Sequence, residues 1–155
     1  MSDYFISDPS VGDFALVYPM FAMVLLTFLV LIKLFRTRVS LARSGEVDPS
    51  YYKTYQGGSE PEKAIQLQRH FANIFESPSL FYVACLAALI IAPATVLIQS
   101  LAWLYVGLRA AHALVHIGSN DLRLRIPIYF GSWLVLLLMW LYVAVAAFTL
   151  RAEFG

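Results

Sequence analysis

Charged residues are scarce in this sequence. Asp, Glu, Lys and Arg make up 14% of its 155 residues, whereas a soluble domain averages about 25%. The chain is instead 60% hydrophobic and 15% aromatic, which excludes an ordinary soluble domain and indicates an integral membrane protein. Residues 1–155 have room for one domain. That length suits a bundle of about four membrane-spanning helices of about 20 residues each.

Other absences narrow the class further. Strand-type alternation is missing, so the fold class is all-α. Cys85 is the single cysteine, which excludes a disulfide framework and a cysteine metal cluster and predicts a buried thiol. The net charge of +1 gives no sign of a nucleic-acid partner. The N-terminus lacks the basic region of a signal peptide, so the first apolar run is expected to stay as a span.

Four apolar runs predict the four transmembrane helices, at about 14–35, 61–92, 94–117 and 127–151. The second run is longer than a bilayer needs, so its first turns are expected to project into water. We expect it to continue without a break, with a kink at Pro78, and to end at Pro93.

The distribution of basic residues predicts the topology. The connection between the first two helices and its flanks holds seven of the eleven basic residues of the chain, and Arg123 and Arg125 follow the third helix. The N-terminus and the connection between the second and third helices have none. The positive-inside rule therefore places both basic loops in the cytoplasm and both termini outside.

Two polar stripes run along the second and third predicted helices. The first consists of Glu62, Gln66, Arg69, Asn73 and Glu76. The second consists of Tyr105, Arg109, His112 and His116, joined by Asn120 if the helix extends that far. Spacings of three and four residues place each stripe on one helical face, and ionisable residues within a membrane are expected to face protein, water or a ligand. A purely structural alternative is that the stripes satisfy each other, with Arg109 paired to Glu76.

The pair His112 and His116 raises the question of a metal or haem. Two imidazoles four residues apart can ligate zinc, but no third ligand is spaced to join them on that helix. Arg109, one turn away, would also repel a cation. We therefore expect no metal.

No Ser/His/Asp nucleophile set is readable, and Cys85 lies too deep in an apolar run for an activated thiolate. A nucleophile would have to arrive with a ligand. What the chain offers is a set of arginines together with Asn73 and the carboxylate of Glu76. This set suits a small anionic or zwitterionic molecule at the cytoplasmic membrane edge, because guanidinium groups match carboxylates and stabilise thiolates. Anionic lipid head groups are the alternative ligand for each arginine.

These residues resemble a known family. Arg69-x-x-x-Asn73-x-x-Glu76, closely followed by a proline, resembles the second-helix signature of the MAPEG family, the membrane-associated proteins of eicosanoid and glutathione metabolism. Arg109-x-x-His112-x-x-x-His116, with Arg125 nine residues later, is similar to the third-helix pattern of its prostaglandin E synthase branch. The stretch RHFANIFESPSLFYVACL looks closest to bacterial members, which implies a bacterial inner membrane.

The resemblance implies a homotrimer of four-helix protomers that binds glutathione at subunit interfaces near the cytoplasmic face. It implies glutathione contacts at Arg36, Arg69, Asn73, Glu76, Arg109, His112 and His116. Arg125 would be the catalytic residue, stabilising the thiolate that attacks a lipophilic electrophile arriving from the bilayer. Arg123 is the alternative for this role. The implied activity is that of a glutathione transferase or peroxidase.

Three positions depart from the family pattern. His116 stands where a tyrosine commonly contacts glutathione, Ile126 where prostaglandin E synthase has a serine, and Ala72 where that enzyme has an arginine. A prostaglandin substrate is therefore not expected, and the sequence leaves the electrophile open. The retained Arg125 favours the enzyme, whereas His116 and Ala72 favour the alternative function, a non-catalytic membrane protein of this fold that binds a lipid or a protein partner.

Overall fold

The structure, a computed structural model, describes residues 14–91 and 95–154. Every regular element in these two segments is helical. The helices are η1 (Phe14–Leu16), α2 (Val17–Arg43), α3 (Tyr51–Thr54), α4 (Glu62–Asn73), α5 (Ser77–Ile91), α6 (Val96–Ile117) and α7 (Leu122–Phe154). The all-α prediction is confirmed for the described residues.

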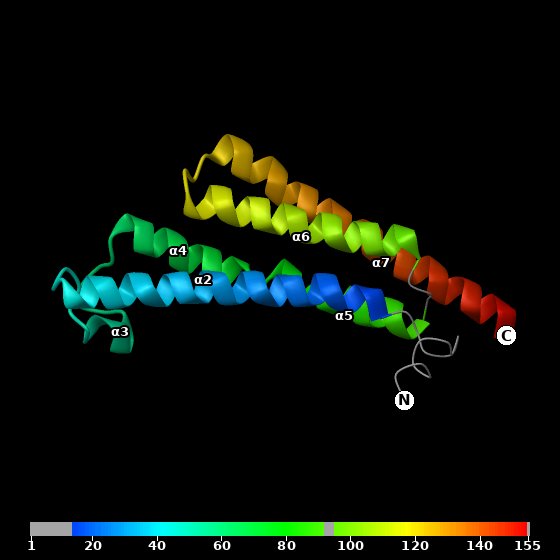
Figure 1. Cartoon of the computed structure of the whole chain (residues 1–155), viewed down its shortest axis with the longest axis horizontal. Helices are drawn as coiled ribbons and strands as arrows, with labels where there is room; N and C mark the ends of the chain where they lie inside the picture. The colour runs from blue at the N-terminus through cyan, green and yellow to red at the C-terminus, as the bar shows by residue number, and fades with distance from the viewer. Residues whose placement is uncertain (1–13, 92–94, 155) are drawn as a thin grey trace, which may run out of the picture.

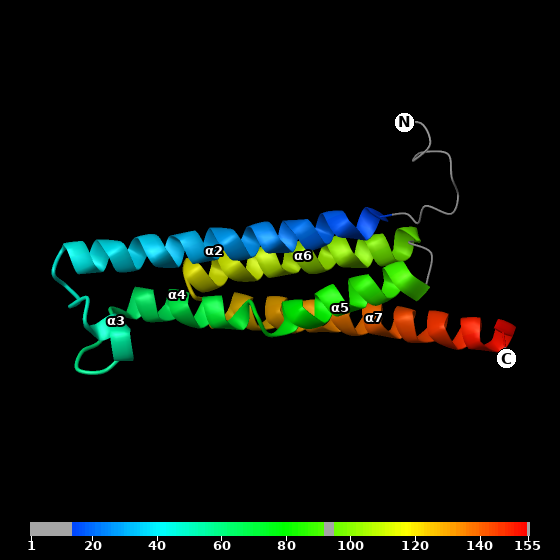
Figure 2. The ribbon, with the colours of Figure 1, turned by 90° about the horizontal axis from the view of Figure 1, so that it is seen from below.

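The long helices run side by side as an elongated bundle (Figure 1). α6 packs along α7, α2 contacts both α4 and α6, and α5 packs on α7. The start of α2 and the end of α7 lie at one end of the bundle. The α2–α4 connection and the α6–α7 turn lie toward the other end (Figure 1 and Figure 2). α2 and α4 reach beyond the α6–α7 turn, so their ends project from the bundle.

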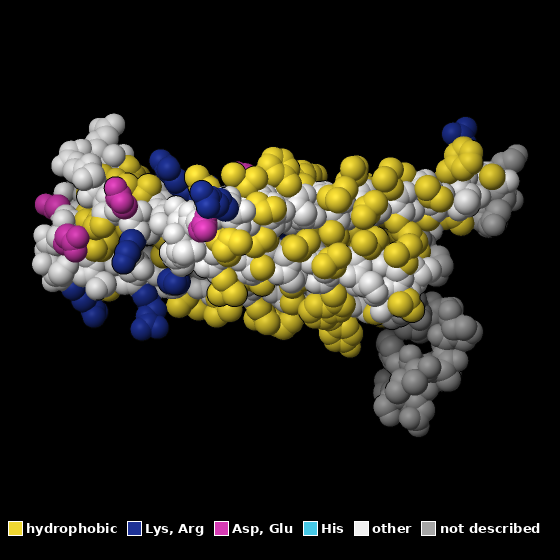
Figure 3. Space-filling view, turned by 90° about the horizontal axis from the view of Figure 1, so that it is seen from above, with side chains coloured by type: hydrophobic (Ala, Val, Ile, Leu, Met, Phe, Trp, Pro, Cys, Tyr) yellow, Lys and Arg dark blue, Asp and Glu magenta, His cyan; other side chains and the backbone are white. Residues whose placement is uncertain are grey.

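The surface divides into an apolar body and a charged end. Figure 3 shows hydrophobic side chains over most of the length and the Lys, Arg, Asp and Glu side chains gathered mainly toward the end with the α2–α4 connection. Three helical stretches are long and apolar enough to cross a membrane: η1 with α2 (Phe14–Arg43), α4 with α5 (Glu62–Ile91), and most of α7 (Leu122–Ala152). α6 is not among them; it carries Arg109, His112 and His116, and all three are buried inside the bundle.

Several helix bounds differ from the sequence prediction. α2 continues past residue 35 to Arg43, and α7 begins at Leu122, so that Pro127 lies inside the helix rather than at its start. The expected end of the second helix at 92 and start of the third at 94 fall outside the described residues.

The predicted continuous helix over 61–92 is wrong. α4 ends at Asn73, a turn covers residues 74–76, and α5 begins at Ser77 with Pro78 in its first turn. A proline ring clashes with the carbonyl group four residues earlier, which here belongs to Ile74, and proline is well tolerated in the first turn of a helix. The chain therefore starts a new helix at the proline instead of bending one helix around it.

The main hydrophobic core lies in the apolar body, among η1 and helices α2, α5, α6 and α7. Phe81 of α5 stacks on Tyr105 of α6 with 4.5 Å between ring centroids. The Tyr105 hydroxyl forms a hydrogen bond of 2.8 Å with Ser77 Oγ, which fixes the start of α5 against α6. Cys85 is a free, buried cysteine, as expected.

Arg38 fastens the projecting end of α2 to the α2–α4 connection. Its Nε donates to Glu60 Oε1 at 3.1 Å, and its Nη2 donates to Gln68 Oε1 at 2.8 Å. The guanidinium also lies over the rings of Tyr52 and Tyr55, 5.2 and 5.4 Å from their centroids. These contacts engage the Arg38 side chain with the α2–α4 connection. Of the two arginines Arg36 and Arg38, only Arg36 is then available to a ligand.

Gly118 closes α6 before the turn into α7, and its replacement by alanine should destabilise the bundle. Gly118 N–H donates to Leu114 O at 2.9 Å, and a Cβ at Gly118 would lie 2.7 Å from that carbonyl oxygen. The backbone would have to shift, so we expect Gly118→Ala to cost about 1–3 kcal/mol, measured as a lower unfolding temperature in detergent.

Gly107 provides the matched control in the same helix. A Cβ there meets nothing within 4 Å, and alanine favours a helix over glycine by about 1 kcal/mol. Gly107→Ala should therefore be neutral or stabilising. Equal unfolding temperatures for the two variants would show that the Gly118 turn relaxes without cost.

Candidate functional site

Polar residues of α4 and α6 meet the beginning of α7 around a cavity of about 330 Å³. It is lined by Arg69, Asn73, Glu76, His112, His116, Arg125, Ile126, Tyr129 and Phe130. A second cavity, of about 390 Å³, shares three of these residues and adds Glu62, Ile65, Gln66 and Asn120. The two adjoining cavities, called the site cavity and the outer cavity below, lie toward the charged end of the molecule.

The spacing within each helix explains why these side chains converge. Residues three or four apart lie on one helical face, and α4 packs against α6, so the faces bearing the two stripes meet. Gln66 of α4 donates a hydrogen bond to the backbone oxygen of His116 near the end of α6. This contact sets the register between the two helices.

Arg109 lies behind the site cavity rather than in its wall. Only 1% of the residue is exposed. Its Nη2 donates to Asn73 Oδ1 at 2.9 Å and to Asn73 O at 3.3 Å. Asn73 is the last residue of α4, and its backbone oxygen accepts from both this guanidinium and the Glu76 N–H, the latter at 3.2 Å.

Asn73 links Arg109 to the carboxylate of the first stripe. Its Nδ2 donates to Glu76 Oε2 at 2.9 Å. The direct Arg109–Glu76 pair of the purely structural alternative is thus replaced by a relay through the asparagine amide. Asn73 and Glu76 both remain on the wall of the site cavity.

Arg125 and Arg123 have different surroundings. Arg125, near the start of α7, lines both cavities, and its Nη1 donates to Asn120 Oδ1. Arg123 is exposed and lines neither cavity; its backbone N–H donates to Asp121 Oδ1 at 2.9 Å. Geometry therefore favours Arg125 over Arg123 as the residue that meets a ligand.

The structure brings six of the eight site residues named from the sequence to one cavity: Arg69, Asn73, Glu76, His112, His116 and Arg125. Arg109 supports them from behind. Arg36 is separate; it is exposed on α2 and lines shallow grooves formed by α2 itself. Within one chain it cannot share a small ligand with the other residues.

Sequence reasoning missed two residues of this region. Tyr129 lines the site cavity, with its ring 5.5 Å from that of His112. Its position four residues after Arg125 was a usable signal, because that spacing puts both on one face of α7. His70 was also missed: with Gln66 and Asn73 it satisfies helical spacing as well as Arg69 does, and only packing decides which of the two points inward.

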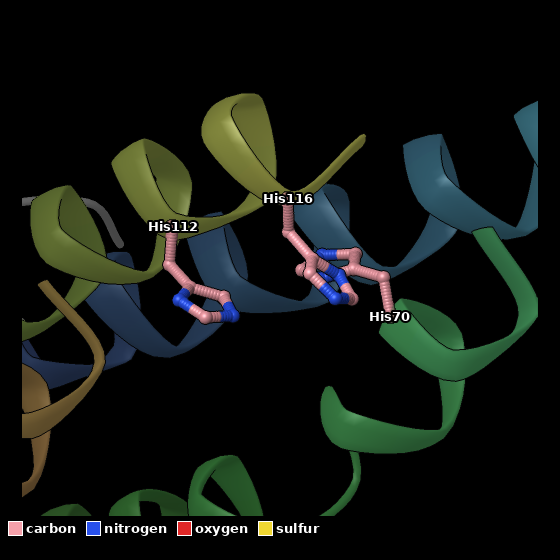
Figure 4. Close-up of side chains that lie close together, drawn as sticks. All are labelled: His70, His112 and His116. Atoms are coloured by element: carbon pink, nitrogen blue, oxygen red, sulfur yellow. The ribbon is translucent and has the colours of Figure 1, made fainter. Parts of the chain in front are cut away.

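His70 supplies the third imidazole that α6 lacks. It is fully buried, at 0% exposure, and its ring lies 5.6 Å from that of His112 and 5.0 Å from that of His116. Figure 4 shows the rings of His112 and His116 descending from α6 toward the ring of His70 from α4. One ligand atom from each side chain lies within 4.8 Å of the others.

Comparison with known proteins decides the family. A model of the MAPEG family matches residues 16–145. The chain belongs to the MAPEG family. The match spans most of the chain, and its range includes every residue of both cavities. No curated protein and no solved structure matches this MAPEG chain.

Proposed function

We propose that this protein uses the thiol of glutathione to conjugate or reduce lipophilic electrophiles in the site cavity. One observation carries the proposal: Arg125 faces the same cavity as the polar set Arg69, Asn73 and Glu76. A tripeptide with two carboxylates, an ammonium group and a thiol needs such a mixed set of donors and acceptors. Family membership supports the same ligand.

Each residue has a chemical role in this proposal. Arg69 pairs with a carboxylate of glutathione, Glu76 accepts from its ammonium group, and Asn73 contacts its backbone. The Arg125 guanidinium donates hydrogen bonds to the sulfur, which favours the thiolate and releases the proton to water. The thiolate then forms a bond to the electrophilic carbon, and the leaving group departs with the bonding electrons.

The apolar residues Ile126 and Phe130 complete the cavity wall beside Arg125. Both are exposed side chains on α7, one of the helices apolar enough to cross a membrane. An electrophile dissolved in the bilayer can therefore approach the sulfur along an apolar surface. Binding of a lipid without chemistry at the same surface is the alternative function.

The complete proposal includes assembly and topology. Each protomer crosses the membrane four times, with α6 as the fourth span shielded by the other helices, and three protomers associate. Association would bring Arg36 of one protomer to the site of a neighbour, which its exposure on α2 allows. The mass of the protein in detergent tests the trimer, and a monomeric mass would exclude a two-subunit site.

The charged end of the bundle faces the cytoplasm in this proposal, with both termini outside and a bacterial inner membrane as the location. The gathering of basic side chains at that end supports it. Cysteines introduced one at a time at Ser44 and Asp121, in a Cys85→Ala background, should react with a membrane-impermeant thiol reagent only from the cytoplasmic side. Labelling from outside in intact cells would reverse the topology.

Glutathione binding to the detergent-purified protein tests the function directly. We expect saturable binding at millimolar concentrations, followed by conjugation of a chlorodinitrobenzene-type electrophile. The matched variant Arg69→Ala should bind glutathione about 10-fold or more weakly, because a hydrogen bond to a charged group contributes about 1.5–3 kcal/mol. Absence of saturable binding would end the glutathione proposal, and binding without turnover would favour the non-catalytic alternative.

A further inference from the structure

All histidines of the chain meet at one point. The sequence has three, and His70, His112 and His116 are the group described above as having ligand atoms within 4.8 Å of one another. They come from two helices that are far apart in the sequence, and all three are buried. Burying three polar rings against one another contributes little to the stability of a protein interior. Their proximity therefore suggests a ligand that imidazole nitrogens can bind.

Four of the six ring nitrogens in this cluster lack protein partners among the described residues. Both ring nitrogens of His70, and Nδ1 of His112 and of His116, are buried without a hydrogen-bond partner among the described residues. A buried polar group left unpaired costs about 1–3 kcal/mol. Four such atoms in one cluster carry a heavy cost. Each ring offers one nitrogen to a metal, so a ligand that accepts a lone pair from every ring would lower this cost.

We propose that His70, His112 and His116 bind a divalent transition-metal ion of the zinc type. Neutral imidazole is the commonest metal ligand in proteins, and three histidines are a known ligand set for zinc. Zn–N bonds of about 2.0–2.1 Å put the nitrogens of a tetrahedral site about 3.3 Å apart. The cluster reaches this spacing from within 4.8 Å by rotations of side chains on helices that are already packed together.

The fourth coordination position faces the site cavity. His112 and His116 belong to the wall of that cavity, whereas His70 lies behind them. No Asp, Glu or Cys joins the three histidines in the metal-ligating group found among the described residues. Three protein ligands with one open position are the arrangement of catalytic rather than structural zinc sites, with water or another exogenous donor in the fourth place.

Two arginines add positive charge near the proposed metal site. Arg109 and Arg125 both act electrostatically on His70, and their positive charges weaken the attraction of a cation. Arg109 is already bound to Asn73, which in turn binds the carboxylate of Glu76. The excess positive charge around the metal selects an anion, such as hydroxide, as its fourth ligand. The proposed metal site shares His112 and His116 with the site cavity, but metal binding requires no glutathione, so it can be tested without glutathione and can fail or succeed separately from the function proposed above.

Metal titration of the detergent-purified full chain tests the site. The protein is purified without a histidine tag, treated with a chelator and titrated with Co²⁺ and Zn²⁺. We expect one ion per chain, visible ligand-field bands typical of four-coordinate cobalt, and their loss on competition with zinc. Added azide should change the cobalt spectrum by taking the open position. A spectrum indifferent to azide would overturn the open position, and no saturable binding would overturn the site.

His70→Leu is the decisive variant, because His70 lines neither cavity and makes no hydrogen bond that its loss would break. It should fold at least as stably as the metal-free wild type, lose about 100-fold or more in metal affinity, and no longer gain unfolding temperature with zinc. Cys85→Ala, which removes the chain's one thiol, should bind metal like the wild type. Wild-type metal affinity in His70→Leu would overturn the proposal.

Discussion

Replacement of Arg125 by alanine should lower kcat/KM for conjugation of a chlorodinitrobenzene-type electrophile by about 10²–10³-fold, the typical effect of removing one donor that stabilises a reacting anion. Arg125 lines the site cavity, where it can donate to the glutathione sulfur. Without it, far less of the bound thiol is ionised near neutral pH. The measurement is steady-state turnover of detergent-purified wild type and variant at saturating glutathione.

The matched control is Arg123→Ala, two residues away in the first turn of α7; Arg123 is exposed and lies outside both cavities. It should keep wild-type turnover. Arg125→Lys should fall between wild type and Arg125→Ala, because an ammonium group keeps the charge but loses the planar fork of donors. If Arg123→Ala lost turnover and Arg125→Ala kept it, Arg123 would be the residue that stabilises the thiolate.

The pH dependence separates thiolate stabilisation from a structural effect. A guanidinium that stabilises the thiolate lowers the pKa of the bound thiol, so wild-type turnover should reach its plateau below the pKa of a free cysteine thiol, about 8.5. In Arg125→Ala the thiol ionises only near its own pKa, and turnover should keep rising through that range. A variant that is merely misfolded would stay inactive at every pH, and its mass in detergent would change.

The polar stripes were the part of the site that the sequence predicted well. Helical spacing alone grouped Arg69 with Asn73, and His112 with His116, because residues three or four apart on a helix share a face. Glu76 lies in the turn after α4 and is held beside Asn73 by a hydrogen bond instead. Spacing within a helix carries no information about which helices meet. The contact of α4 with α6, and the place of Arg109 behind Asn73, follow from packing between elements about 36 residues apart.

The failures have equally specific causes. His70 and Arg69 are neighbours, and either completes a helical stripe with Gln66 and Asn73; burial of one and exposure of the other depend on α6. The break at 74–76 was readable, since a proline disrupts the carbonyl four residues earlier, but the apolar run after Pro78 suggested continuity. The family resemblance implied Arg36 as a contact at a subunit interface; in one chain it lies on the outer surface of α2, so its role stays a prediction.

Truncation of Asn73 should be among the most destabilising single changes in the polar region of the bundle. Asn73→Ala removes the Oδ1 that accepts from Arg109 at 2.9 Å and leaves the backbone oxygen, at 3.3 Å, as the remaining acceptor. Nε and Nη1 of this buried guanidinium already lack partners among the described residues. An undercompensated buried charge costs about 3–5 kcal/mol, so we expect a loss of about 2–4 kcal/mol, measured by unfolding in mixed micelles.

A double-mutant cycle identifies the cause. Arg109→Met removes the charge while retaining a long side chain, and it leaves Asn73 with the carboxylate of Glu76 as a partner, so its cost should be smaller than that of Asn73→Ala. In the Arg109→Met background, Asn73→Ala should cost less than about 1 kcal/mol, since no buried charge remains to be stranded. If the losses of unfolding free energy in the two single variants add up to that of the double variant, Asn73 stabilises the junction of α4 and α5 independently of Arg109.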